Sequence, residues 1–87
     1  MRNIRLTGRE QNIVRVIGFA EGMLGAEIQD NTHMDAEDVT DTLNSLMSAG
    51  FVECIPYRDQ IEMAEMPVTS FEINAAYAHE LRDALYR

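Results

Sequence analysis

The predicted fold depends on one stretch of sequence, Leu43-Asn44-Ser45-Leu46-Met47-Ser48-Ala49-Gly50-Phe51-Val52. Leu43 and Leu46 are three residues apart, a spacing that places two side chains on the same face of a helix, where they can pack against other helices. Gly50 is well placed as the left-handed residue that ends this helix, because it has no Cβ. Phe51 then starts an apolar run, which predicts a strand that covers the open side of the helices.

A first helix is predicted near the N-terminus. Thr7 and Glu10 have the spacing of a capping box, in which each side chain binds a free backbone amide at the start of a helix. Apolar residues then recur at helical spacing up to residue 20. We expect Gly22 and Gly25 to end or interrupt this helix, and Gly18 to be a close-packing point inside it.

Two more helices are expected before the strand. Leu24 and Ile28, followed by a polar run, indicate a short second helix of about two turns. Asp35 is a good N-cap for the third helix. The apolar stripe of this third helix consists of Ala36, Val39, Leu43, Leu46 and Met47.

The C-terminal third of the chain predicts two strands and a fourth helix. Residues 51–57 and 68–73 have strand-forming composition, with a turn expected at Arg58-Asp59-Gln60. Pro67 confines the segment before it to a loop or a sheet edge, because proline donates no backbone hydrogen bond. Asn74 should cap the last helix, whose inward residues are Tyr77, Ala78, Leu81, Ala84 and Leu85.

This order of elements, together with the Leu43 to Val52 pattern, resembles the winged helix-turn-helix superfamily from about Leu6 to Tyr86. The resemblance implies an α+β fold, a winged helix in which a three-helix bundle is followed by a C-terminal β-hairpin wing and a fourth helix. Independently of the resemblance, the length of 87 residues predicts one domain, residues 1–87. In DNA-binding members of this superfamily the third helix enters the major groove and the hairpin touches the flanking backbone.

The charge distribution disfavours a polyanionic partner. The net charge is −8 on 87 residues. Residues 1–20 carry four arginines and one glutamate, a local +3, whereas residues 21–54 carry eight acidic residues and neither Lys nor Arg. The acidic block covers the segment that a DNA-binding winged helix normally presents.

DNA binding is therefore the alternative interpretation. The residues expected to face outward on the third helix include Glu37, Asp38 and Asp41, which would repel phosphates. Thr40 and Asn44 also face outward in this prediction and can contact base edges. A DNA-binding form would use Arg5, Arg9, Thr40, Asn44 and Arg58, through the N-terminal arm, the third helix and the wing.

The preferred interpretation is a regulatory, non-catalytic module that acts by protein–protein contact. We expect a homodimer, or a complex with another protein attracted by the negative charge. Methionines adapt to partner surfaces, and the last helix carries apolar side chains that one domain cannot all bury. The predicted interface consists of Met63, Met66, Val68, Tyr77, Leu81 and Leu85.

Catalysis, cofactors and metal ions are not expected. His33 and His79 have no zinc-site spacing, and no glycine-rich phosphate loop is present. The single cysteine, Cys54, lies in an apolar run and is interpreted as a buried structural thiol. With no apolar run of membrane-spanning length and no signal peptide, the expected compartment is the cytoplasm, without membrane contact.

Overall fold

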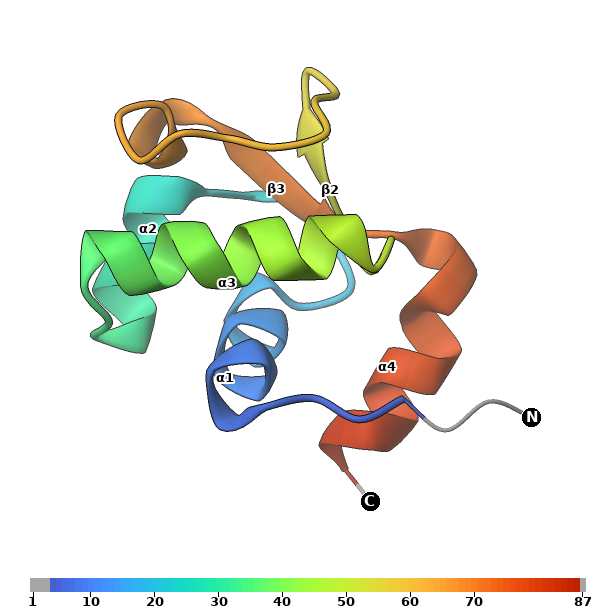
Figure 1. Ribbon diagram of the computed structural model, residues 1–87. Helices are drawn as coiled ribbons and strands as arrows, with labels where there is room; N and C mark the ends of the chain where they lie inside the picture. Colours follow the sequence, from blue (N-terminus) through green and yellow to red (C-terminus); the bar gives the residue numbers. More distant parts are fainter. Residues whose placement is uncertain (1–3, 87) are drawn as a thin grey trace.

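The computed structural model describes residues 4–86, which form four α-helices and a three-stranded antiparallel sheet (Figure 1). The fold is therefore α+β, as the sequence predicts. The helices are α1 (Gly8–Ile17), α2 (Gly25–Thr32), α3 (Ala36–Ser48) and α4 (Ala78–Leu85), and the strands are β1 (Met23–Leu24), β2 (Val52–Ile55) and β3 (Ser70–Ile73). Two short 3-10 helices, η1 (Met66–Val68) and η2 (Ala75–Tyr77), precede β3 and α4.

The sheet has the order β1-β3-β2, and its register sorts side chains between two faces. Met23 and Cys54 both lie opposite Phe71, and Cys54 and Phe71 are buried. Because residues directly opposite each other share a face, this row is on the inner face. The next row, in which Leu24 and Ile55 flank Ser70, is on the outer face.

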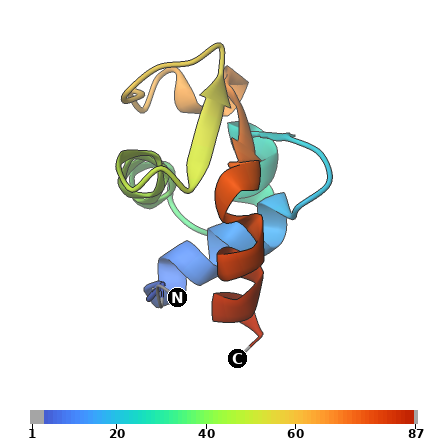
Figure 2. The same ribbon diagram turned by 90° about the vertical axis from the view of Figure 1, so that its right-hand side faces the viewer.

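The core lies between the inner face of the sheet and the four helices. Its most buried side chains come from α1, α2, α3, α4, the strands and η1: Ile13, Val14, Ile28, Val39, Leu43, Leu46, Val52, Met66, Phe71 and Leu81. In both ribbon views α1 and α4 lie toward one end of the molecule, and the 56–69 segment lies at the other (Figures 1 and 2). Leu43 and Leu46 are completely buried, which confirms their predicted packing role.

Helix α1 begins as predicted but ends earlier. The Thr7 hydroxyl accepts from the Glu10 amide at 3.2 Å, and the Glu10 carboxylate accepts from the Thr7 amide at 2.8 Å, so the capping box is confirmed. The predicted interior position of Gly18 is wrong. Gly18 is the C-cap of α1, with φ 74°, and a Cβ there would meet nothing within 4 Å. Its role is backbone reversal rather than close packing.

The sheet differs from the predicted two-stranded hairpin in three ways. Strand β1, two residues long, was not predicted, because so short a strand has no alternation of its own and is recognised only by its pairing with β3. The connection between β2 and β3 is also long, covering residues 56–69, and Arg58-Asp59-Gln60 is only its first part. Val68 belongs to η1, so the return strand begins at Ser70.

One end of the antiparallel β2–β3 pair, where β2 begins and β3 ends, is fixed by two residues that the sequence singles out. Gly50 adopts φ 85° after α3, as predicted. The Asn74 side chain accepts from the Ala76 amide at 3.0 Å and donates to the Gly50 carbonyl at 2.8 Å. Asn74 thus caps η2, through which the chain enters α4, and also ties that junction to the end of α3.

Within residues 4–86, no helix has the length and apolar character needed to cross a membrane.

Candidate interaction surfaces

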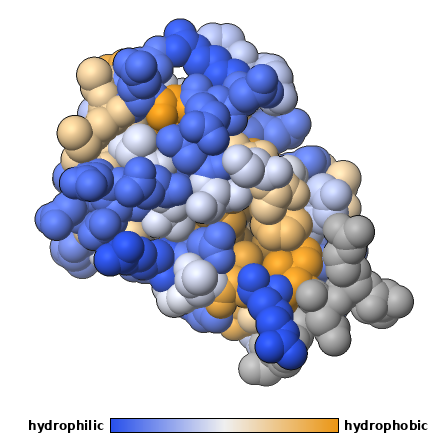
Figure 3. All heavy atoms as spheres, in the orientation of Figure 1, coloured by the Kyte–Doolittle hydropathy of each residue, from blue (hydrophilic) through white to orange (hydrophobic). Residues whose placement is uncertain are grey.

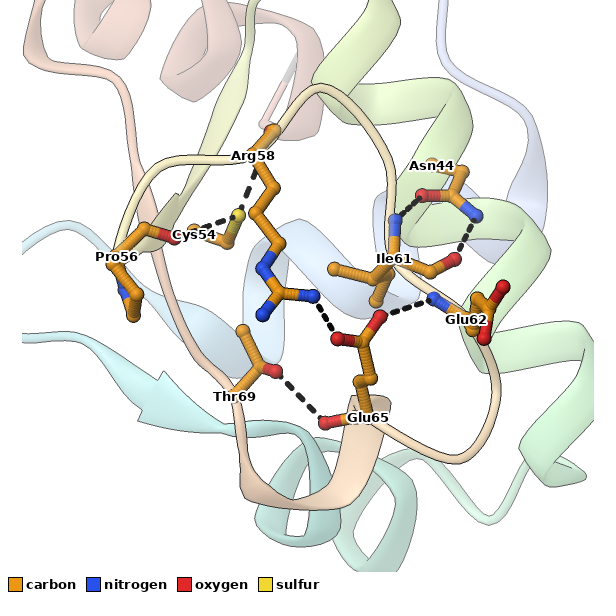
Figure 4. A network of polar contacts seen from close by, with 8 residues as sticks. All are labelled: Asn44, Cys54, Pro56, Arg58, Ile61, Glu62, Glu65 and Thr69. Carbon is orange, nitrogen blue, oxygen red and sulfur yellow. Dashed lines mark hydrogen bonds and ion pairs between the residues drawn. The ribbon is translucent and has the colours of Figure 1, made fainter.

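The 56–69 segment folds back onto α3, and Asn44 holds it there. The Asn44 side chain accepts a hydrogen bond from the Ile61 amide at 2.9 Å and donates one to the Ile61 carbonyl at 2.9 Å (Figure 4). The Ile61 side chain is buried beside it. The side-chain amide therefore satisfies both backbone groups of a residue that is buried outside regular structure.

A second set of contacts closes the segment on itself. Arg58 forms an ion pair with the Glu65 carboxylate, which also accepts from the Glu62 amide at 3.2 Å (Figure 4). The Thr69 hydroxyl donates to the Glu65 carbonyl at 2.8 Å. At the start of the segment, the Cys54 thiol lies 3.6 Å from the carbonyl oxygen of Arg58. Cys54 is buried, as predicted.

The segment also packs on α2 through Met66, which is completely buried. A Cβ added to Gly25, the first residue of α2, would lie 1.8 Å from the Met66 carbonyl oxygen and 2.7 Å from its sulfur. Only glycine permits this approach of two backbones.

Three of the five residues predicted to contact DNA instead form polar contacts within the chain. The expected outward position of Thr40 is wrong: it is 5% exposed, and its hydroxyl donates to the Ala36 carbonyl at 2.8 Å. Asn44 holds Ile61, and Arg58 is paired with Glu65 rather than extended at a hairpin tip. Arg5 is exposed, and Arg9, with a side chain 63% exposed, lies 3.4 Å from the Asp38 carboxylate.

The solvent-facing side of α3 is acidic and polar. Its exposed residues are Glu37, Asp41, Ser45 and Ser48. Figure 3 shows that hydrophilic residues cover most of the molecular face on which α3 lies. Since no Lys or Arg occurs on this helix, the surface repels phosphate groups.

Some residues of the predicted protein interface are buried in the structure, and others are exposed. Met66, Leu81 and Leu85 are buried in the chain's own core, so the expectation that the last helix has surplus apolar residues is wrong for Leu81 and Leu85. Tyr77 is partly buried and makes an edge-to-face contact with Phe51, with ring centroids 5.2 Å apart. The exposed members are Met63, at 51%, and Val68, at 79%.

Sequence reasoning missed two exposed apolar residues on the outer face of the sheet. Leu24 is 44% exposed and Ile55 is 51% exposed. The sequence held a signal for Ile55: the polar Glu53 lies between Val52 and Cys54, and alternate residues of a strand share a face, so Ile55 should face outward with Glu53. Leu24 had no such signal, because its assignment depends on the pairing of β1 with β3.

Two hollows in the surface lie beside α3. One, of about 440 Å³, lies beside the end of α3, the start of β2 and residues 57–60. In it the Tyr57 hydroxyl donates to the Asp59 carboxylate at 2.7 Å, and this hydrogen bond with the nearby negative charge raises the Tyr57 pKa. The other, of about 540 Å³, lies between the start of α1 and the Asp41 to Ser45 part of α3.

Among residues 4–86, no group of three or more His, Cys, Asp or Glu side chains is arranged to hold a metal ion.

Replacing Asn44 by alanine is expected to release the 56–69 segment locally. The change leaves the Ile61 amide and carbonyl without partners, which should lower the free energy of unfolding by about 1–3 kcal/mol. Hydrogen exchange at the Ile61 amide should accelerate much more than exchange in α1. Ser45→Ala, an exposed change on the same helix, is the matched control. Unchanged protection of Ile61 in the Asn44 variant would show that the segment is held by other contacts.

No family model matches this chain, and neither a curated protein nor a solved structure matches it.

Proposed function

We propose that this chain is a winged-helix domain that works as a non-catalytic module of regulatory type, acting by protein–protein contact. The order of its elements, three helices, an antiparallel strand pair and a fourth helix, supports the winged-helix assignment. On this assignment α3 corresponds to the helix that reads DNA in nucleic-acid-binding members.

One observation favours a protein over DNA as the partner of this domain. The best candidate on α3 for reading a base, Asn44, is bound on both its amide atoms by the Ile61 backbone. Around it the exposed charged side chains of α3 are the carboxylates Glu37 and Asp41. Without cations to neutralise phosphates, this helix lacks the electrostatic attraction that supplies most non-specific DNA affinity.

Self-association is one form of this proposal. Of the predicted interface residues, Met63 and Val68 have the exposure that a contact with a second copy needs. Light scattering at increasing protein concentration tests this form. A dimer mass would identify the second copy as a partner, whereas a monomer mass would exclude this form of the proposal.

A titration with random-sequence duplex DNA at low salt tests the function. We expect no salt-dependent binding, and the double variant Arg5→Glu, Arg58→Glu should behave like the parent protein. Since each phosphate neutralised by a cation contributes to the salt dependence, a parent protein that binds with a steep salt slope would contradict the proposal. Because Arg58→Glu also breaks the ion pair with Glu65, loss of that binding would establish DNA contact through the N-terminal arm and the 56–69 segment only if the melting transition of the double variant is unchanged.

A further inference from the structure

The outer face of the sheet carries a group of exposed apolar side chains. Leu24 and Ile55 lie directly opposite Ser70 on its two sides, so the three side chains form one row across the sheet. Val68 lies in η1, just before β3, and is 79% exposed; η1 lies beside β1, so Val68 is at the edge of this face. The small Ser70 side chain leaves Leu24 and Ile55 as the prominent groups of this row.

An acidic pair lies in the next row of the same face. Glu53 lies directly opposite Glu72 in the β2–β3 register. Because Val52, Cys54 and Phe71 point into the core, the two glutamates point outward. Like charges directly opposite each other in a sheet are destabilising. Among residues 4–86, neither carboxylate forms an ion pair.

We propose that this outer surface, formed by Leu24, Ile55, Val68, Glu53 and Glu72 and termed the sheet face, binds a segment of a different protein that is apolar on one side and carries Lys or Arg beside it. The proposal rests on the proposed function and names the surface and the class of partner. Burial of the apolar row supplies affinity, and the partner's cations remove the repulsion between Glu53 and Glu72.

The charge of the sheet face argues against a second copy as its occupant. If two copies used the same face symmetrically, each would bring Glu53 and Glu72 into one contact. Four carboxylates would then be confined with no cation supplied by the face itself. A basic partner avoids this repulsion.

The test uses a synthetic amphipathic helical peptide made of leucine and lysine, titrated into the full chain while backbone amide NMR shifts are followed. Shifts should concentrate in β1, β2 and β3, and a leucine and glutamate peptide of the same pattern should not bind. Ile55→Ser and Val68→Ser should each weaken binding by about tenfold. Thermal melting of each variant verifies that it is folded.

The carboxylates are tested with matched pairs of substitutions. The double variant Glu53→Gln, Glu72→Gln should bind the lysine peptide more weakly and with less salt dependence, while its melting temperature stays equal or rises. The control Glu37→Gln, Asp41→Asn removes two carboxylates from α3 and should leave binding unchanged. Tyr86→Ser, at an exposed apolar residue after α4, is the apolar control.

Any of five results would overturn the proposal. Shifts centred on α3, or equal weakening by the α3 control, would move the contact to α3 and leave the protein-contact function standing. Absence of lysine-peptide binding would remove the sheet face as a basic-partner site. Concentration-dependent shifts of the sheet face without peptide would make a second copy its occupant. Binding of the glutamate peptide would contradict the requirement for Lys or Arg on the partner. Failure of the proposed function itself is seen separately, as salt-dependent binding of duplex DNA.

Discussion

Replacement of Leu43 by alanine is expected to lower the free energy of unfolding by about 2–5 kcal/mol. The Leu43 side chain is completely buried in the core between α3 and its neighbours. The substitution removes its apolar contacts and leaves a cavity that close-packed neighbours only partly fill. Urea or thermal unfolding followed by circular dichroism measures the change.

Ser48→Ala is the control for this loss, because Ser48 is exposed on the same helix. Its effect should stay within about 0.5 kcal/mol, the usual range for a surface change. An unfolding transition of Leu43→Ala that coincides with that of the parent protein would contradict the packing of α3 described above.

Replacement of Gly25 by alanine is expected to have the second large effect. The added Cβ would lie 1.8 Å from the Met66 carbonyl oxygen, which is a backbone atom and cannot rotate away as a side chain does. Either α2 or η1 must move, and overpacking of this kind costs on the order of 1–3 kcal/mol or more. The same movement should disturb the hydrogen bond from the Gly25 amide to the Thr69 carbonyl, which measures 2.9 Å.

Gly8→Ala gives a closely matched comparison. Gly8 is the first residue of α1 as Gly25 is of α2, but a Cβ at Gly8 would meet nothing within 4 Å. Because alanine restricts the unfolded chain, Gly8→Ala should be neutral or stabilising by up to about 1 kcal/mol. Thermal unfolding of both variants measures the difference. Equal effects of the two substitutions would mean that η1 does not approach α2 as closely as described.

The exposed surfaces follow from how the 56–69 segment is placed. Because this segment lies against α2 and α3, it buries Met66 and Ile61 and engages Asn44. Val68 is left exposed in η1, which lies beside β1. The sequence indicates a contact through the last helix together with Met63, Met66 and Val68. The proposed contact keeps Val68 and otherwise lies on the sheet.

Local features of the fold were predictable from the sequence. The Thr7–Glu10 capping box, the left-handed Gly50 and the cap at Asn74 each depend on groups only a few residues apart. Helical periodicity likewise identified Leu43 and Leu46 as core residues, because the 3.6-residue repeat is a property of one helix.

Thr40 shows where periodicity is insufficient. A polar residue beside an apolar stripe is expected to face solvent, yet Thr40 is buried. Its hydroxyl is satisfied by the Ala36 carbonyl one turn earlier, so burial leaves no unpaired polar group. The helix alone does not determine whether a neighbouring element covers such a residue.

The sequence by itself determined the α+β class, the order of the helices, the β2–β3 pair and the acidic character of α3. Tertiary structure alone decided the pairing of β1, the burial of Leu81 and Leu85, and the engagement of Asn44 by Ile61. The physical reason is the distance along the chain: helix caps and periodicity come from neighbouring residues, whereas these contacts join segments whose relative positions are set by packing of the whole core.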